Sequence, residues 1–475
     1  MGLLKDFAFV ESAAAAPALA EVIREDLIRA LFVRDDRLLP RDVVAPLAKG
    51  AAITVKVKNE EDVRRLVRVA NGHESTTSLG LGAEDYHYVR MQLAIGKDRD
   101  IGISMKPSTL TTYDWIVPPQ GGILVDPAGL DGVEVDPAGH QAVVGVGAKW
   151  KSLCDRAREL GRFVPFLPHV PLDYAMGDAI FGDAVFSAYA APFLSYVYGL
   201  RVISPAGDRA RAGFDEVPPL GTGYDIVELS LAAGAEWVIP VALAVRLAPR
   251  PPVMRTLEYG FGEPAKAAEA VDRLTKSGRT ILWARVFDER SWPLAQPISA
   301  PGPWVIEVGL GGTAAAVVAS EKALDALLAG STAKVATTPD FETDAAAYAK
   351  TGGKVGRLLF VGEVVAPARR FGALYSSLRA GAEKEGQRFG AFTTLSARGT
   401  ASLSVFFEAV RDRPRAYEMS RMVRTAVASV PGALFESRLS QLWSMDPVYR
   451  KRLELLLRLK RHIDAPRVAE PLVTV

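Results

Sequence analysis

The order of apolar and polar positions predicts a strand followed by a helix near the start of the chain. Residues 11–34 begin with an Ala-rich run and predict one or two helices. Residues 51–57 (AAITVKV) read as a short buried strand, and apolar side chains at helical spacing follow over 63–70. Asn59 stands where an N-cap is expected, and Gly72 where the helix ends.

Beyond this unit the pattern changes to short strands. A helix with one apolar face is expected after the third of them, with Gly161 closing its C-terminus. Turns containing Pro, Ala and Gly separate the first three strands. Strands are expected at residues 122–126, 132–135, 141–147, 198–204 and 237–247.

The stretch 78–120 has no clear period. It contains scattered glycines, several tyrosines and the pair Pro118-Pro119. We interpret it as a long loop that contains a hairpin, and residues 83–120 as an insertion.

Arg250-Pro251-Pro252 is the predicted domain boundary, because a double proline after a strand favours an extended linker. Strands and helices then alternate in three rounds, which predicts a ferredoxin-like α+β sheet. The tail is expected to be helical, with a basic segment over 449–463. The predicted division is an N-terminal helical segment, a first domain, a second domain, and a C-terminal helical segment, at residues 1–50, 51–249, 250–435 and 436–475.

Charge and composition exclude several classes of protein. A formal net charge of +2 gives no field of the kind that nucleic-acid binding needs. The single cysteine, Cys154, excludes an internal disulfide framework. Lys5, Asp6 and Glu11 interrupt any secretory signal, and no stretch is apolar enough for a membrane helix. We therefore expect a cytoplasmic protein.

Three phrases carry a resemblance to a known family. They are the run GGILVDPAGLDGVEVDPAGHQAVVGVGAKWKSLCDRARELG, the phrase YGLRVISPAGD, and the run GTGYDIVELSLAAGAEWVIPVALAVRLAP. LKRHIDAPRVAEP near the end adds a weaker match. In order and spacing they resemble flavoproteins of the vanillyl-alcohol oxidase type, which include D-lactate and glycolate dehydrogenases. The resemblance implies a two-lobed FAD-binding domain of the p-cresol methylhydroxylase type, a ferredoxin-like cap domain and a helical tail.

The resemblance also implies which residues would contact FAD. Two glycine-bearing loops would present backbone N–H groups to the pyrophosphate, and a third stretch and a strand would line the flavin. These residues are Gly80, Gly82, Gly177, Gly223, Tyr224, Asp225 and Ile239.

A purely structural role is the alternative for the glycine positions. Gly80 and Gly82 also suit a flexible turn, and Gly223 with its neighbours suits the start of a helix. Asp178 replaces the second glycine of the family's second loop, and a carboxylate beside a pyrophosphate is repulsive unless it points away. Gly177 with Asp178 is otherwise a polar turn.

Two residues are candidates for substrate chemistry. His169, between two prolines, could face or attach the flavin, or be a surface loop histidine. Arg398 lies where the family carries a histidine-rich segment that this chain lacks; it could bind a substrate carboxylate or be a surface arginine. The histidines show no metal-ligand spacing, so no metal site is expected.

Two functions follow from the resemblance. The first is FAD-linked oxidation of a small 2-hydroxyacid or alcohol, with an electron-acceptor protein or a quinone in place of NAD. The second is a flavin-domain relative without catalysis that serves as a structural or electron-relay subunit. Ether-lipid synthesis on the same scaffold is a third chemistry that no residue selects. The basic segment 449–463 could dock on a membrane face or a partner subunit, and self-association is a further expectation.

Overall fold

The computed structural model describes a little under half of the first 250 residues and most of the chain from there to residue 437. The described residues are 53–71, 102–105, 122–136, 138, 140–168, 174–181, 186–191, 193–213, 227, 230–231, 238–295, 299–337, 358–408 and 413–437. The N-terminal helices expected at 11–34 and the basic segment 449–463 lie outside them.

The first lobe is a three-stranded parallel sheet in the order β1-β3-β2, with helix α3 (Glu60–Asn71) beside it. The predicted N-cap of α3 is confirmed, because Asn59 Oδ1 accepts the Asp62 N–H at 3.0 Å. Asp62 Oδ2 in turn accepts the Lys58 N–H at 2.9 Å. The strands are β1 (Ile53–Lys56), β2 (Gly102–Met105) and β3 (Gly122–Asp126).

Strand β2 corrects the interpretation of residues 78–120 as a long loop with a hairpin. Gly102–Met105 pairs in parallel with β3, so this part of the stretch belongs to the core sheet. Ile103 and Met105 are buried there. A strand of four residues is too short for its alternation to stand out from a loop.

The second lobe is a five-stranded antiparallel sheet in the order β10-β9-β11-β5-β4. Helix α5 (Trp150–Glu159) ends at Gly161, whose φ of +66° is the left-handed conformation expected of a glycine there. The strands are β4 (Val133–Val135), β5 (Gln141–Gly145), β9 (Val197–Ile203), β10 (Arg209–Gly213) and β11 (Ile239–Arg246). Shorter elements are η2 (Pro127–Gly129), β6 (Arg162–Phe163), β7 (Leu167–Pro168), α6 (Asp178–Phe181), β8 (Phe186–Ser187), η3 (Phe193–Tyr196) and β12 (Ala248–Pro249).

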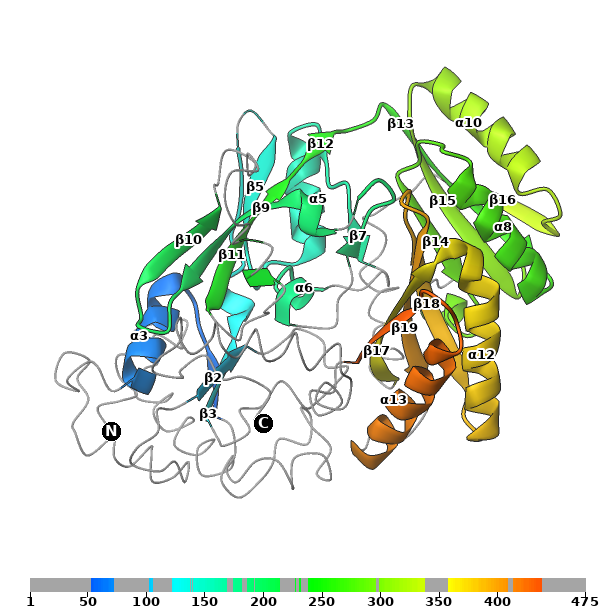
Figure 1. Ribbon diagram of the computed structural model, residues 1–475. Helices are drawn as coiled ribbons and strands as arrows, with labels where there is room; N and C mark the ends of the chain where they lie inside the picture. The colour runs from blue at the N-terminus through cyan, green and yellow to red at the C-terminus, as the bar shows by residue number, and fades with distance from the viewer. Residues whose placement is uncertain are drawn as a thin grey trace.

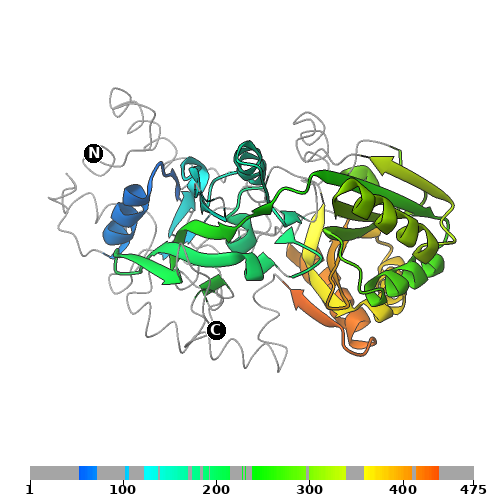
Figure 2. The same cartoon turned by 90° about the horizontal axis from the view of Figure 1, so that it is seen from above.

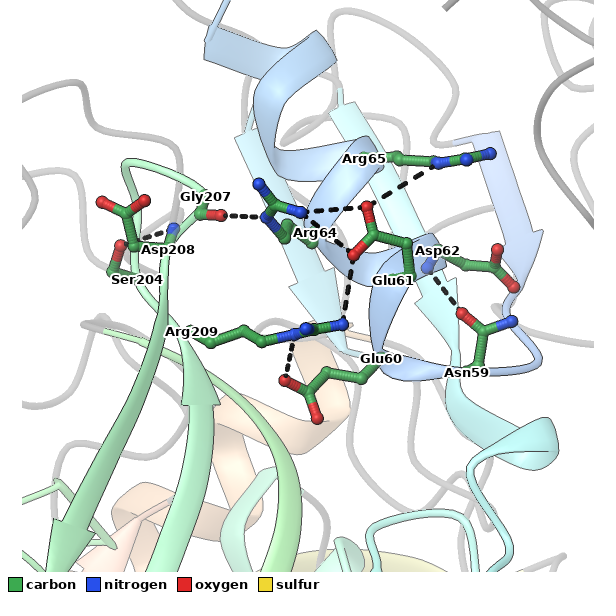
Figure 3. A network of polar contacts seen from close by, with 10 residues as sticks. All are labelled: Asn59, Glu60, Glu61, Asp62, Arg64, Arg65, Ser204, Gly207, Asp208 and Arg209. Atoms are coloured by element: carbon green, nitrogen blue, oxygen red, sulfur yellow. Dashed lines mark hydrogen bonds and ion pairs between the residues drawn. The ribbon is translucent and has the colours of Figure 1, made fainter.

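An ion-pair network joins these two lobes (Figure 3). Arg209, at the start of β10, places its Nε 2.9 Å from Glu60 Oε1 and its Nη2 3.2 Å from Glu61 Oε2. Arg64 Nε donates to the Gly207 carbonyl at 3.1 Å, and Arg64 Nη1 pairs with Glu61. The first turn of α3 is therefore held against the β9–β10 turn.

Arg209→Gln is expected to lower the free energy of unfolding by only about 0.5–1 kcal/mol, because the Arg209 side chain is 59% exposed and water screens the pair. The difference from the parent protein should shrink towards zero at about 1 M NaCl. Urea unfolding at low and high salt measures both values. A loss that salt leaves unchanged would show that packing, not charge, is what Arg209 contributes.

The second half of the chain forms one eight-stranded antiparallel sheet in the order β16-β13-β15-β14-β18-β19-β17-β20. Its strands are β13 (Val253–Phe261), β14 (Trp283–Phe287), β15 (Trp304–Gly312), β16 (Ala333–Thr337), β17 (Leu359–Pro367), β18 (Phe389–Leu395), β19 (Thr400–Phe407) and β20 (Leu434–Ser437). Its helices are α8 (Pro264–Lys276), α9 (Trp292–Ala295), α10 (Ala314–Leu327), η4 (Ala368–Arg370), α12 (Phe371–Lys384) and α13 (Arg413–Ala428).

This sheet contains the ferredoxin-like unit twice. The first βαββαβ unit consists, in chain order, of β13, α8, β14, β15, α10 and β16. Its strands lie in the sheet in the order fourth, first, third, second. The second βαββαβ unit consists of β17, α12, β18, β19, α13 and β20. Along the sheet its strands lie in the reverse of the first unit's order, as second, third, first, fourth. The two units join where β14 pairs with β18. The ferredoxin-like prediction thus describes each half of a duplicated sheet.

The two faces of this sheet belong to different hydrophobic cores. Helices α8, α10, α12 and α13 cover one face, and Figure 1 shows α8, α10 and α12 on the side away from the first two lobes. The opposite face contributes aromatic side chains to the core of those lobes. Figure 2 shows the sheet beside the two lobes from above. These side chains are Trp283, Phe287, Phe360, Phe392 and Phe406.

No helix among the described residues is both long enough and apolar enough to span a lipid bilayer.

Candidate active site

A row of polar side chains crosses the sheet face that meets the first core. Glu258 on β13 lies directly opposite Glu307 on β15, and Glu307 lies opposite Arg285 on β14. Arg285 is in turn opposite Thr394 on β18. The row therefore runs through the centre of the sheet and reaches the junction of the two ferredoxin-like units.

Strand alternation explains why these charges share one face. Leu257 and Tyr259, on either side of Glu258, belong to the helix-covered core, so Glu258 points to the opposite face. Ile306 and Val308 flank Glu307 in the same way. A charged residue in the middle of an apolar strand is costly to bury, and it persists where partners or function require it.

Arg285 and Glu307 form a buried ion pair. Arg285 Nη2 lies 2.7 Å from Glu307 Oε1, and Arg285 Nε donates to the same oxygen at 2.8 Å. Their side chains are 8% and 2% exposed. Trp283 Nε1 donates to this oxygen as well, at 2.9 Å, so three N–H groups hold the charge of Glu307.

Gly309 makes room for that indole. A Cβ built on Gly309 would lie 2.1 Å from the Trp283 ring, because the ring lies across the neighbouring strand at this point. Without the glycine the ring would have to move, and its hydrogen bond to Glu307 would be lost.

Glu258 differs from Glu307 in having an oxygen without a partner. It is 3% exposed, and its Oε2 is buried with no hydrogen bond from any described residue. Burial, and after it the nearby Glu307 charge, raise the pKa of Glu258 to about 7, and Arg285 opposes the shift. A carboxyl group of this kind exchanges a proton close to neutral pH, as general acid–base groups do.

The row lies beside contacts between the sheet and the first two lobes. Arg285 Nη1 donates to the Pro168 carbonyl at the end of β7, at 3.4 Å. Tyr189, which follows β8, donates its N–H to Leu282 at 3.1 Å and accepts the Ala397 N–H at 2.7 Å. The Tyr189 ring is buried in the helix-covered core of the sheet.

Two of the residues predicted to contact FAD are described. The Gly177 N–H donates to the Val146 carbonyl at 2.8 Å, and a Cβ on Gly177 would meet the Phe181 ring at 2.3 Å, so its own turn requires the glycine. Asp178 is fully buried and accepts the Ala175 N–H at 3.2 Å, which turns its carboxylate back into the protein. Ile239 is buried at the start of β11, opposite Ile203.

Of the remaining predicted residues, the structure describes Arg398. Arg398 is exposed in the turn between β18 and β19. Gly80, Gly82, Gly223, Tyr224, Asp225 and His169 lie outside the described residues. His169 follows Pro168 directly in the chain, and Pro168 is the residue whose carbonyl Arg285 contacts.

The sequence alone did not predict a site made of Glu258, Arg285 and Glu307. The available signal was a charged residue at the centre of each of three apolar strands, in TLEYGF, LWARVF and WVIEVGL. The pairing that gathers them on one face depends on strand order, which those phrases do not contain.

Among the described residues, no group of three or more His, Cys, Asp or Glu side chains could hold a metal ion.

Comparison with known proteins identifies the fold. No protein-family model matches the chain, and no curated protein matches it in sequence. Among solved structures, 4-ethylphenol oxidase from Gulosibacter chungangensis, in complex with isoeugenol, superposes with a TM-score of 0.64 at 14% identity over 96% of this chain and 97% of that one. This chain therefore has the fold of 4-ethylphenol oxidase.

Two further structures agree with this. p-Cresol methylhydroxylase with substrate bound gives a TM-score of 0.62 at 16% identity over 97% of both chains. Alkyldihydroxyacetonephosphate synthase gives 0.60 at 13% identity over 89% of this chain and 76% of that one. The resemblance found in the sequence is therefore confirmed at the level of the fold. None of these three is a D-lactate or glycolate dehydrogenase.

Proposed function

We propose that this chain is an FAD-dependent oxidoreductase that oxidises a small hydroxyl-bearing substrate, an alcohol or a 2-hydroxyacid, and passes the electrons to an acceptor other than NAD. The full-length likeness to two phenol-oxidising enzymes supports an FAD-linked activity. The observation that carries the chemistry is the buried Glu258 carboxyl, which has an oxygen without a partner among the described residues. Because the named neighbours are enzymes, the alternative of a subunit without catalysis is not favoured.

One described group suits a hydroxylic substrate at this face of the sheet. Glu258 Oε2 is an acceptor whose donor would come from a bound molecule. Trp283, Phe287 and Phe392 are buried in the core at the same face. Bound FAD would supply the two-electron oxidant. The residues proposed to hold it remain those of the sequence resemblance, Gly80, Gly82, Gly177, Gly223, Tyr224, Asp225 and Ile239.

An uncharged alcohol suits the site better than a 2-hydroxyacid. Glu307 already engages the Arg285 guanidinium, and Glu258 adds a second carboxyl group beside it. A substrate carboxylate at this position would meet two acidic groups and a cation that is already neutralised. We therefore place a neutral alcohol first among the substrates.

The visible absorption spectrum of the purified protein, before and after acid precipitation, tests this proposal. We expect flavin bands whose chromophore is released into the supernatant, and dye reduction with alcohols faster than with 2-hydroxyacids. Chromophore left in the pellet would indicate a covalent link, to be tested with His169→Ala. A colourless protein that takes up no added FAD would contradict the proposal.

A further inference from the structure

We propose that Glu258 is the residue that accepts the substrate's hydroxyl proton during oxidation, an inference that rests on the proposed function. Glu258 lies on the sheet face that meets the first core, and its side chain is 3% exposed. Its Oε2 has no hydrogen-bond partner among the described residues. A buried acceptor left in this state needs a donor, and a substrate hydroxyl is one.

Glu307 cannot take this role as it stands. Its Oε1 accepts three N–H groups, two from Arg285 and one from Trp283, at 2.7–2.9 Å. These donors stabilise the ionised form, so Glu307 and Arg285 act as a fixed charge pair. Glu258, directly opposite on the next strand, is the member of the row that can change its charge.

The proton and electron balance of the step is simple. The substrate O–H bond breaks and its proton passes to Glu258, while the C–H bond breaks and its two electrons and hydrogen leave for FAD, so that a carbonyl forms. Glu258 then releases its proton to solvent. The electron acceptor, a quinone or an electron-transfer protein, removes the two electrons and completes the cycle.

The charges around Glu258 determine how the activity depends on pH. Among the described residues, Glu307 on β15 and Arg285 on β14 face it, and its partner on β16 is the apolar Val335. Burial and Glu307 together raise the pKa of Glu258 to about 7. The rate of substrate oxidation should therefore rise with pH through about 7, as the carboxyl group loses its proton.

The kinetic test compares the parent holoenzyme with Glu258→Gln, which keeps the shape of the side chain and cannot accept the proton. We expect unchanged flavin absorption and reduction by an alcohol that is slower by about 10²- to 10⁴-fold, with the rise near neutral pH lost. Glu408→Gln, an exposed position on the same sheet, is the matched control and should behave as the parent. A Glu258→Gln enzyme that reacts at the parent rate with the same pH profile would overturn the inference and leave the proposed function intact.

A second test needs no activity. Below its ordinary pKa of 4.5, Glu258 is protonated in both the folded and the unfolded protein, so its raised pKa does not change the free energy of unfolding. Above 4.5 the unfolded chain loses the proton first, and the free energy of unfolding falls with pH until Glu258 ionises in the folded protein as well, above about 7. Glu258→Gln should therefore match the parent Tm at about pH 5 and exceed it by about 2–6 °C at about pH 8. Equal pH dependence in both proteins would show that Glu258 does not titrate there, and would overturn the inference. A parent protein that takes up no FAD would overturn the proposed function and this role with it.

Discussion

Arg285→Met is expected to lower the free energy of unfolding by about 3–5 kcal/mol, the usual cost of removing one partner of a buried ion pair. The substitution leaves Glu307 and Glu258 facing each other without the cation that lies between β15 and β18. It also removes the hydrogen bond from Arg285 to Pro168 of the first two lobes. Guanidinium unfolding monitored by tryptophan fluorescence measures the loss.

Two comparisons separate charge from packing in this variant. Arg290→Met is the matched control, because Arg290 pairs with Glu408 at 3.0 Å on the same sheet but both side chains are partly exposed; its cost should stay below about 1 kcal/mol. Adding Glu307→Gln to Arg285→Met should recover most of the loss, since it removes one of the two opposed carboxylates. If the double variant is as unstable as Arg285→Met alone, packing rather than charge is responsible.

The same variant should lose more stability as pH rises. Arg285 opposes the upward shift in the pKa of Glu258, so its removal leaves burial and the Glu307 charge to raise that pKa further above its unfolded value. The penalty is absent at low pH, where Glu258 is protonated in both states, and grows as pH passes its ordinary value of 4.5. Unfolding curves at about pH 5 and about pH 8 measure this trend.

Asp288→Ala is expected to cost about 3–5 kcal/mol, because it leaves several buried donors without an acceptor. Asp288 Oδ2 accepts the Tyr375 hydroxyl at 2.6 Å and the Ala391 N–H at 3.0 Å. Its Oδ1 accepts the N–H groups of Ser291 at 2.7 Å and Arg290 at 3.0 Å. Asp288 is 1% exposed. It follows β14 and bonds to α12 and β18, so it connects the two ferredoxin-like units.

Tyr375→Phe is the graded companion to this variant. It removes one donor and leaves the other three bonds of Asp288 in place, so its cost should be about 1–2 kcal/mol. Tyr375→Phe should lower the free energy of unfolding of the Asp288→Ala protein by less than it lowers that of the parent, because the two side chains share one hydrogen bond. Strict additivity in urea unfolding would show that the two residues act independently.

Local order was readable from the sequence wherever a short segment decides its own structure. A strand was expected at residues 122–126, and β3 spans Gly122–Asp126. The caps at Asn59 and Gly161 were expected from residue type and are present. Each depends on neighbours a few positions apart in the chain, and the periodicity of apolar side chains over one segment reports those neighbours directly.

The active-site proposal was not readable in this way. Glycine loops and a histidine were expected from the resemblance, whereas the polar row comes from residues on three strands that are far apart in the chain. Gly177 shows the limit of a motif, since its turn requires a glycine for internal packing whether or not a phosphate binds. Arg398, for which a surface position was one of two expectations, is exposed in the turn between β18 and β19.

By itself, then, the sequence determined the strands and helices, their caps, the ferredoxin-like pattern of the second half, and a resemblance strong enough to predict the fold. Only the tertiary structure decided that the pattern occurs twice in one sheet, and that Glu258, Arg285 and Glu307 share its buried face. The physical reason is the range of the interactions. Helix and strand preferences act between near neighbours, whereas the pairing of β13, β15 and β14 is set by how the whole sheet buries its two faces against two different cores.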